Sequence, residues 1–215
     1  MSLSPVSPPD GAVSSRAEAR RDQIRAAAAA CFRRHGFHGT SIAQISKSAG
    51  MSPGHIYHYF ANKEAIIEDI VAQDLQRVLT LIAEMSSAED VLDAMITRVA
   101  EGVANHLDAD AAALRLEIAA EAARNPRIAA IVRDADRRSR DSLAQTVRHA
   151  RRAAGHRDSD ADIDAHVEVI AAMFEGLQIR SVRNPGLDRD RIVRNYRRML
   201  RDLLTQPKEA ADGHG

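Results

Sequence analysis

At residues 40–63 the chain reads TSIAQISKSAGMSPGHIYHYFANK, which predicts two very short helices around a tight turn and the start of a third helix. Ser41 can cap the first helix, and Gly50 can end it because glycine readily adopts the left-handed conformation needed just past a C-terminus. Ser52 can cap the second helix, with Pro53 at its first position, where the missing backbone N–H costs nothing. Helix, glycine-containing turn and helix form a unit that reads the major groove of DNA.

The residues before this stretch predict another helix, over residues 16–36, whose apolar side chains recur at the spacing of an amphipathic helix. Five of the chain's seven aromatic residues lie between Phe32 and Phe60. Short helices need large side chains to bury enough apolar area, so we expect a small three-helix core. Its expected members are Ile24, Ala28, Phe32, Phe37, Ile42, Ile45, Ile56 and Phe60.

The rest of the chain is also predicted to be helical, because Gly and Pro are sparse after residue 11 and no stretch alternates like a strand. The fold class is therefore all-α, with about nine helices. A long helix over residues 62–85 links the N-terminal unit to the remainder. The later helices are expected at residues 88–107, 110–124, 126–154, 160–182 and 187–206.

This pattern predicts two domains between two tails. Residues 16–63 would form a helix-turn-helix DNA-binding domain, and residues 86–206 a ligand-binding and dimerisation domain. The Pro/Ser-rich residues 1–15 and the residues 207–215 are expected to be disordered tails.

The charge of the chain is unevenly distributed. Its formal net charge is zero, with 30 Lys/Arg and 30 Asp/Glu. Residues 16–63 hold eight Lys/Arg and two acids, a net charge of +6, so the rest of the chain carries −6. A basic block at one end indicates a polyanionic partner there.

Other sequence features narrow the class of protein. The single cysteine, Cys31, excludes an internal disulfide and falls on the apolar face of its helix, as a small hydrophobic residue would. There is no apolar run near the roughly 20 residues of a membrane span and no secretion signal, so we expect a cytoplasmic protein.

Three motifs together carry a family resemblance: the basic helix ending in Phe32-x-x-x-Gly36-Phe37, the frame Thr40-Ile42-Ile45-Ala49-Gly50, and the run Gly54-x-Ile56-Tyr57-x-Tyr59-Phe60 followed by Asn62-Lys63-Glu64. Over about residues 18–78 the chain resembles the DNA-binding domain of the tetracycline-repressor (TetR) family of bacterial one-component regulators. Residues 80–206 match that family in helix count and length only. The resemblance implies an all-helical homodimer that binds a palindromic operator, usually as a repressor, and releases it when a small molecule binds the C-terminal domain.

The resemblance also implies which residues meet double-stranded DNA. His55 would face base edges, and Ala43 stands where the tetracycline repressor itself has a base-reading arginine, so recognition rests more on the second short helix. Arg16, Arg20 and Arg21 would reach the phosphate backbone or minor groove, or else form a solvated helix face. The expected DNA-binding residues are Thr40, Ser41, Ser52, Gly54, His55, Tyr57, His58, Tyr59 and Lys63, with Tyr57 alternatively in the core.

An effector pocket is expected among the helices between residues 88 and 182. Core packing is the alternative for each of its residues. Few aromatic residues follow Phe60, which favours a small aliphatic or mixed apolar effector over a large planar one. The expected lining is Met95, Val99, Val103, Leu114, Arg115, Leu143, Val147, Met173, Phe174 and Gln178, with Glu117 as a further polar group that could face the pocket.

The last two helices carry an apolar seam that suits a helix bundle between two subunits. Packing within each subunit's own core is the alternative. The seam residues are Ile163, Val167, Ile170, Leu177, Ile192, Tyr196, Met199 and Leu203.

No enzyme site or cofactor site is indicated by the sequence. The pairs His35-x-x-His38 and His55-x-x-His58 lack carboxylate or thiol neighbours at ligand spacing, so we expect no metal. No nucleophilic triad, paired carboxylates or phosphate-binding glycine loop is recognisable. Two alternatives to a ligand-responsive regulator stay open: a helical DNA-associated protein without an effector, and an all-helical enzyme.

Overall fold

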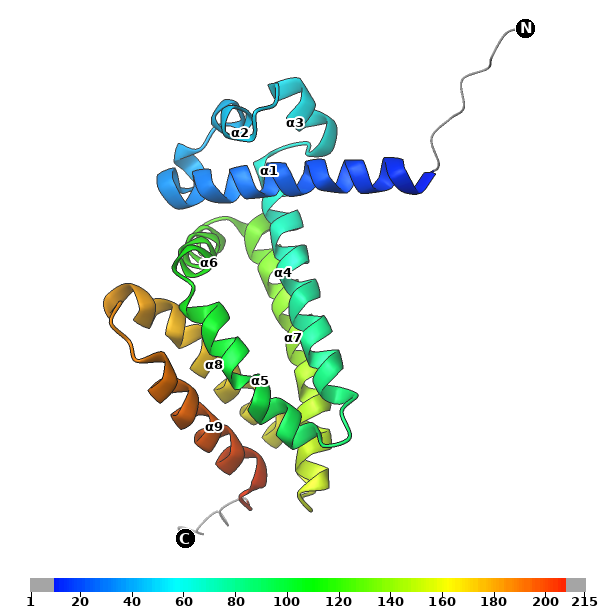
Figure 1. Ribbon diagram of the computed structural model, residues 1–215, viewed down its shortest axis with the longest axis vertical. Helices are drawn as coiled ribbons and strands as arrows, with labels where there is room; N and C mark the ends of the chain where they lie inside the picture. Colours follow the sequence, from blue (N-terminus) through cyan, green and yellow to red (C-terminus); the bar gives the residue numbers. More distant parts are fainter. Residues whose placement is uncertain (1–9, 208–215) are drawn as a thin grey trace, which may run out of the picture.

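The computed structural model describes residues 10–207, which form nine α-helices and no strand (Figure 1). The all-α prediction is therefore confirmed for the described residues. None of the helices in this range is long and apolar enough to cross a membrane. The helices are α1 (Asp10–Gly39), α2 (Ile42–Ala49), α3 (Pro53–Tyr59), α4 (Lys63–Ser86), α5 (Val91–Leu107), α6 (Ala109–Ala122), α7 (Pro126–Ala153), α8 (Asp160–Arg183) and α9 (Arg189–Thr205).

The caps predicted around α2 and α3 are present. Ser41 forms a capping box with Gln44, its hydroxyl accepting from the Gln44 backbone N–H at 3.2 Å. Gly50 ends α2 in the left-handed conformation, with φ 64°. The Ser52 hydroxyl accepts the His55 backbone N–H, and the Asn62 side chain accepts that of Ala65. These caps set the ends of α2, α3 and α4 through contacts between residues at most four positions apart.

Helix α1 begins at Asp10, six residues before its predicted start. The predicted disordered tail over residues 1–15 therefore needs correction for residues 10–15, while residues 1–9 lie outside the described part of the chain. Extending an existing helix costs much less than starting one. At its other end α1 breaks at Gly36, whose φ of 71° and ψ of 169° suit only glycine.

The apolar side chains form two cores. The first contains the expected side chains of α1, α2 and α3, and it also takes Ile118 of α6 and Ile128 of α7. The second core lies among α4, α5, α7, α8 and α9. The N-terminal unit is thus completed by residues that come far later in the sequence.

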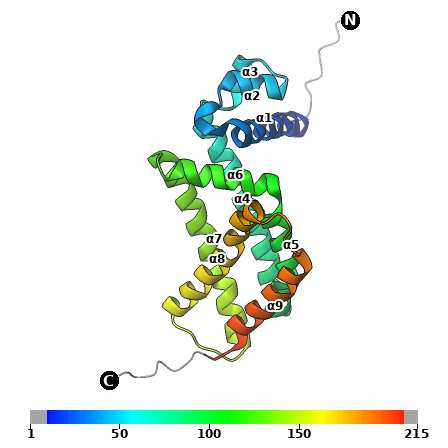
Figure 2. The same ribbon diagram turned by 90° about the vertical axis from the view of Figure 1, so that its left-hand side faces the viewer.

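Two helices join the N-terminal unit to the helical body. Helix α4 leaves the unit and runs along α7, and α6 lies crosswise between α1 and the body (Figures 1 and 2). At the start of α4, Asp69 pairs with the buried guanidinium of Arg25 and, at 3.3 Å, with Arg21 of α1. The position of α1–α3 therefore depends on both α4 and α6.

Candidate nucleic-acid interface and effector cavity

Helix α3 exposes a cluster of polar rings. Only Ile56 of α3 is buried, while His55, Tyr57 and His58 are exposed. The His55 ring stacks on Tyr59 with centroids 5.5 Å apart, and the His58 ring meets Tyr59 edge-on at 5.0 Å. Near them Gly54 leaves open space, since an added Cβ would meet nothing within 4 Å. This face can approach another surface closely and offer both donors and acceptors to it.

The two tyrosines of α3 lie in different environments, and only Tyr59 differs from expectation. Tyr57 is 56% exposed, so the alternative that it belongs to the core is wrong. Tyr59 is partly buried and packs against the N-terminal core. The reason is that α3 is too short for its period to specify which of two neighbouring rings turns inward. Tyr59 instead supports the rings of His55 and His58.

Thr40 and Lys63 were expected to face DNA, but both are used inside the protein. Thr40 is 2% exposed and donates its hydroxyl to the Gly36 carbonyl at 2.8 Å. The Lys63 ammonium donates to the carbonyls of Phe37 and Thr40, each at 2.7 Å, and lies 4.4 Å from the Phe37 ring centroid. These two predictions need correction, because broken helix ends leave carbonyls that need donors.

The other expected DNA-facing groups are more open. Ser41 and Ser52 are exposed at the first residues before α2 and α3, although each hydroxyl already accepts a cap hydrogen bond. Arg16 and Arg20 are exposed on α1, whereas Arg21 is partly buried and lies 5.1 Å from the centroid of Phe60. Arg16 and Arg20 therefore keep their cationic groups available at the surface.

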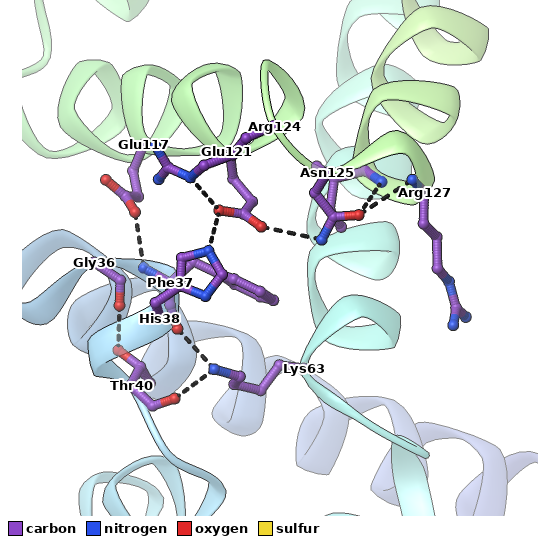
Figure 3. A network of polar contacts seen from close by, with 11 residues as sticks. Gly36, Phe37, His38, Thr40, Lys63, Glu117, Glu121, Arg124, Asn125 and Arg127 are labelled. Atoms are coloured by element: carbon purple, nitrogen blue, oxygen red, sulfur yellow. Dashed lines mark hydrogen bonds and ion pairs between the residues drawn. The ribbon is translucent and has the colours of Figure 1, made fainter.

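A polar network joins the connector between α1 and α2, residues 36–41 after the break in α1, to α6 (Figure 3). The Phe37 backbone N–H donates to Glu117 at 2.7 Å. Glu121, which is 1% exposed, accepts from Asn125 at 3.0 Å and from Arg124 at 3.1 Å, and it lies 3.1 Å from His38 Nε2. Glu117 thus holds the connector, and it does not face the cavity described next.

The carboxylate of Glu121 is kept ionised in spite of its burial. Burial alone would raise its pKa, but hydrogen bonds from Asn125 and Arg124 outweigh that effect and hold the pKa below its ordinary value. A charged acceptor makes stronger hydrogen bonds than a neutral one. The α6 end of the network is therefore an anion that holds Asn125, Arg124 and His38 together.

The helical body encloses a half-open cavity of about 1110 Å³ among α4, α5, α6, α7 and α8. Six expected residues line it: Met95, Val99, Arg115, Leu143, Phe174 and Gln178. Four do not. Val103 and Val147 are fully buried in the second core, Leu114 packs on the first core, and Met173 is partly buried, with its carbonyl accepting the Tyr196 hydroxyl at 2.7 Å.

Other lining residues were missed from the sequence. Asp74, Leu81 and Met85 come from α4, for which the sequence predicts only the role of a link between the two domains. His106 follows Val99 on one face of α5 at a spacing of seven residues, so the helical period could have revealed it. Glu175 of α8 lines the cavity beside Gln178. Helix α4 therefore touches both the cavity and the N-terminal unit.

The predicted seam of α8 and α9 faces its own core. Seven of its eight side chains are buried or partly buried within the chain, and only Met199 is exposed, at 48%. This prediction needs correction for the four buried residues, Ile163, Val167, Ile170 and Leu177, because an apolar stripe has the same period whether it packs inside or between subunits. For the partly buried Ile192, Tyr196 and Leu203 it stays a prediction. The exposed apolar side chains on these helices are instead Val169, Ile179, Val182 and Met199.

Fold and surface together define a helix-turn-helix DNA-binding protein with a helical body that holds a cavity. The family signature described as "Bacterial regulatory proteins, tetR family" matches residues 24–70, and that of "BetI-type transcriptional repressor, C-terminal" matches residues 88–205. The chain belongs to the TetR family of bacterial transcriptional regulators. Its relatives are regulators and not enzymes, and regulators of this family usually act as dimers.

Several known proteins are similar to it. The HTH-type transcriptional regulator UidR of Escherichia coli K12 is 35% identical over 134 residues, which cover 62% of this chain and 67% of UidR. The HTH-type transcriptional repressor AcnR of Corynebacterium jeikeium is 25% identical over 169 residues, covering 79% and 85%. The structure of Salmonella enterica GusR is 31% identical, with a TM-score of 0.72, covering 87% of this chain and 96% of that one.

Proposed function

We propose that this regulator is a repressor that binds a palindromic operator as a homodimer and releases it when a small molecule occupies the cavity of the helical body. The observation that carries the proposal is the exposed ring cluster of α3, His55, Tyr57 and His58, on the most basic part of the chain. Imidazole and phenol groups can donate to and accept from base edges and phosphates. Two copies of α3 would enter successive major grooves about 34–36 Å apart.

Within this proposal the exposed residues divide by role. His55 reads base edges, and Gly54 lets the backbone come close to the groove. Tyr57 and His58 contact the phosphate backbone or bases, and Tyr59 orients the two histidines. Ser41 and Ser52 present backbone N–H groups at their helix starts to phosphates. Thr40 and Lys63 hold the shape of the connector that presents these groups.

Dimerisation is proposed through α8 and α9, on which Val169, Ile179, Val182 and Met199 are the exposed large apolar side chains. Apolar side chains of this size are stabilised when a partner covers them, and a second copy of the chain could do so through the same two helices. This places the interface on the opposite side of α8 from the seam predicted from the sequence.

Helices α4 and α6 would carry the effector signal. Arg115 of α6 pairs with Asp74 of α4 at 3.2 Å on the cavity wall. Two residues further along α6, Glu117 holds the connector of the N-terminal unit. A molecule that shifts this wall therefore moves both attachments of α1–α3, and a coupling of about 1–3 kcal/mol would change operator affinity 5–150-fold.

The test is a footprint and gel shift on the DNA flanking the protein's own gene at roughly 0.15 M salt. We expect a protected palindrome and a loss of about 1–3 kcal/mol of binding with altered base preference for His55→Ala. His149→Ala, an exposed histidine of α7, is the matched control and should bind like the wild type. If no palindrome is preferred over random DNA, the proposal fails.

The cavity weighs against the two alternatives. A DNA-associated protein without an effector needs no cavity of about 1110 Å³, a volume slightly above the roughly 300–1,000 Å³ of small-molecule sites. An enzyme is excluded by the family to which the chain belongs.

A further inference from the structure

The cavity wall contains an amide group whose side-chain atoms have no hydrogen-bond partner among the described residues. Gln178 is 9% exposed, lines the cavity, and its side chain makes no hydrogen bond within the described residues. Its neighbour one turn earlier on the same face is Phe174. This amide offers one acceptor and two donors to the cavity, so a ligand can hydrogen-bond to it without displacing a protein partner.

A second group offers a lone pair to the same cavity. His106 Nδ1 lies 2.8 Å from the Gly102 carbonyl, which can only accept, so Nδ1 carries the hydrogen. Burial lowers the pKa of His106, and of its charged neighbours Arg115 lowers it further while Asp74 opposes the change. The ring is therefore neutral, and its Nε2 is a free acceptor on the cavity wall.

Three of the four guanidiniums of the wall are hydrogen-bonded to carboxylates. Arg115 pairs with Asp74, Arg98 with Glu84 and Glu101 at 2.7 Å each, and Arg140 with Asp136 at 2.9 Å. Arg77 lies at the exposed edge, 3.9 Å from Asp74. Among the lining residues the carboxylates outnumber these guanidiniums. Glu175, near Gln178 on α8, makes no ion pair within the described residues.

The remaining wall is apolar and includes a fixed ring. The Phe174 ring lies edge-on to Tyr196, with centroids 5.6 Å apart, and 5.5 Å from His106. Gly102 makes this possible, because a Cβ there would come within 2.7 Å of the Phe174 ring. Leu81, Met95, Val99 and Leu143 complete the apolar part of the wall.

We propose that the effector is an organic molecule without negative charge, whose apolar body lies on Phe174 and which donates hydrogen bonds to His106 Nε2 and the Gln178 amide oxygen. The inference rests on the proposed function only in taking this cavity as the effector site. It follows from matching partners: His106 Nε2 and the Gln178 amide oxygen can accept hydrogen bonds, and an anion would meet a wall whose carboxylates outnumber its guanidiniums.

Two fluorescent probes with the same ring scaffold test, in the absence of DNA, the prediction that a negative charge on the ligand weakens binding. N-phenyl-1-naphthylamine is neutral with one N–H donor, and its 8-sulfonate derivative differs by one negative charge. We expect the neutral probe to bind the purified full-length protein with enhanced fluorescence. The sulfonate should bind at least about tenfold more weakly. Absence of binding by the neutral probe, or equal or tighter binding of the sulfonate, overturns the proposal.

Two variants test the named groups. Gln178→Leu keeps the volume but removes the amide, and His106→Phe keeps a ring but removes Nε2. Because the probe has one N–H, at least one of the two variants should weaken binding of the neutral probe about fivefold or more, the loss of one hydrogen bond. Gln145→Leu, an exposed glutamine on α7, is the matched control and should bind like the wild type. Circular dichroism checks that both cavity variants keep their helical content. If both are folded and bind the probe with the affinity of the wild type, the hydrogen-bonding part of the proposal is wrong.

The two proposals fail separately. If the protein shows the expected probe selectivity but prefers no palindrome, the ligand proposal is supported and the operator proposal is refuted. If the protein protects a palindrome but binds the sulfonate more tightly, only the ligand proposal is refuted.

Discussion

Single residues at the connector show how far individual side chains set the position of the N-terminal unit. Gly36 turns the chain with a backbone conformation that other residues avoid, and Lys63 closes the same turn from the start of α4. Glu117 reaches the turn from α6. Three separate parts of the chain therefore meet at one turn, and each can be tested by a single substitution.

We expect Gly36→Ala to destabilise the protein by about 1–3 kcal/mol, because alanine is strained at this backbone conformation. The new Cβ would also lie 3.2 Å from the Glu117 carboxylate oxygen. The measurement is chemical unfolding. Gly155→Ala is the control, since it has a φ of 89° but no neighbour within 4 Å, and it should cost less. An unchanged stability of Gly36→Ala would contradict the strain at this site.

Lys63→Ala should lower stability as well as operator affinity. Removing the ammonium leaves the Phe37 and Thr40 carbonyls without their donor, at a cost of about 1.5–3 kcal/mol for a charged hydrogen-bonding group. The change appears as a lower melting temperature without DNA. Lys47→Ala, on the exposed face of α2, is the matched control and should melt like the wild type. If Lys63→Ala melts normally and loses only DNA affinity, Lys63 acts on phosphate and not on the connector.

At the scale of elements, the helices are held together by buried ion pairs at their ends. Arg151 of α7 is 2% exposed and makes two hydrogen bonds to Asp158, at 2.7 and 2.8 Å, in the loop before α8. It also donates to the carbonyls of Leu203 and Gln206 at the end of α9. One guanidinium thus ties together three helices at the far end of the body.

This pair should make stability depend on pH. The hydrogen bonds from Arg151 lower the pKa of Asp158, so its ionised form stabilises the fold above the unfolded pKa of about 3.9. That stabilisation is lost as the pH falls through the lower pKa of the folded state. Asp158→Asn should cost about 3–5 kcal/mol at pH 7, because Arg151 stays buried without its counter-charge. Its stability should also fall less than that of the wild type on acidification.

The matched control is Asp134→Asn, which breaks a surface pair with Arg137 on α7. Exposed pairs of this kind contribute about 0–1 kcal/mol, so its unfolding curve should stay close to that of the wild type. Equal effects of the two substitutions at pH 7 would mean that burial of Arg151 has no energetic consequence.

At the scale of the whole molecule, the N-terminal unit and the body are coupled through α4 and α6. The double substitution Glu117→Ala with Glu121→Ala removes both α6 carboxylates from the connector (Figure 3). We expect operator affinity to fall about fivefold or more, the lower end of usual coupling energies, because the two copies of α3 lose their fixed separation. The Phe37 amide should also exchange its hydrogen faster.

The control for this change is Glu89→Ala, an exposed glutamate between α4 and α5. It should alter neither operator affinity nor the exchange of the Phe37 amide. Unchanged values for the double variant itself would show that α4 alone positions the N-terminal unit.

The proposed dimer is tested by Val182→Asp. Val182 is 64% exposed, so a carboxylate there leaves the isolated chain folded but would be buried against the partner. We expect monomers in sedimentation experiments with helical content unchanged. Ala130→Asp, on an exposed position of α7, is the control and should remain dimeric. A dimeric Val182→Asp would place the interface elsewhere.

Much of the fold follows from the sequence alone, because its signals act over short distances along the chain. The clearest of these signals are the helix caps Ser41, Gly50, Ser52 and Asn62. Each cap satisfies backbone groups at a helix end or ends the helix within a few residues. Together they determine α2, α3 and the start of α4 without help from the rest of the protein. The apolar period likewise determines that the remaining segments are helices with one buried face.

Only the tertiary structure decides what each buried face meets. The stripe containing Ile163 and Val167 packs into its own core, and Tyr59 turns inward where Tyr57 could have done so. Lys63 and Glu117 find partners far along the chain, and α4 becomes a cavity wall. The physical reason is that helical periodicity specifies direction around an axis but not the neighbour in that direction. The neighbour is set by contacts between residues distant in the sequence.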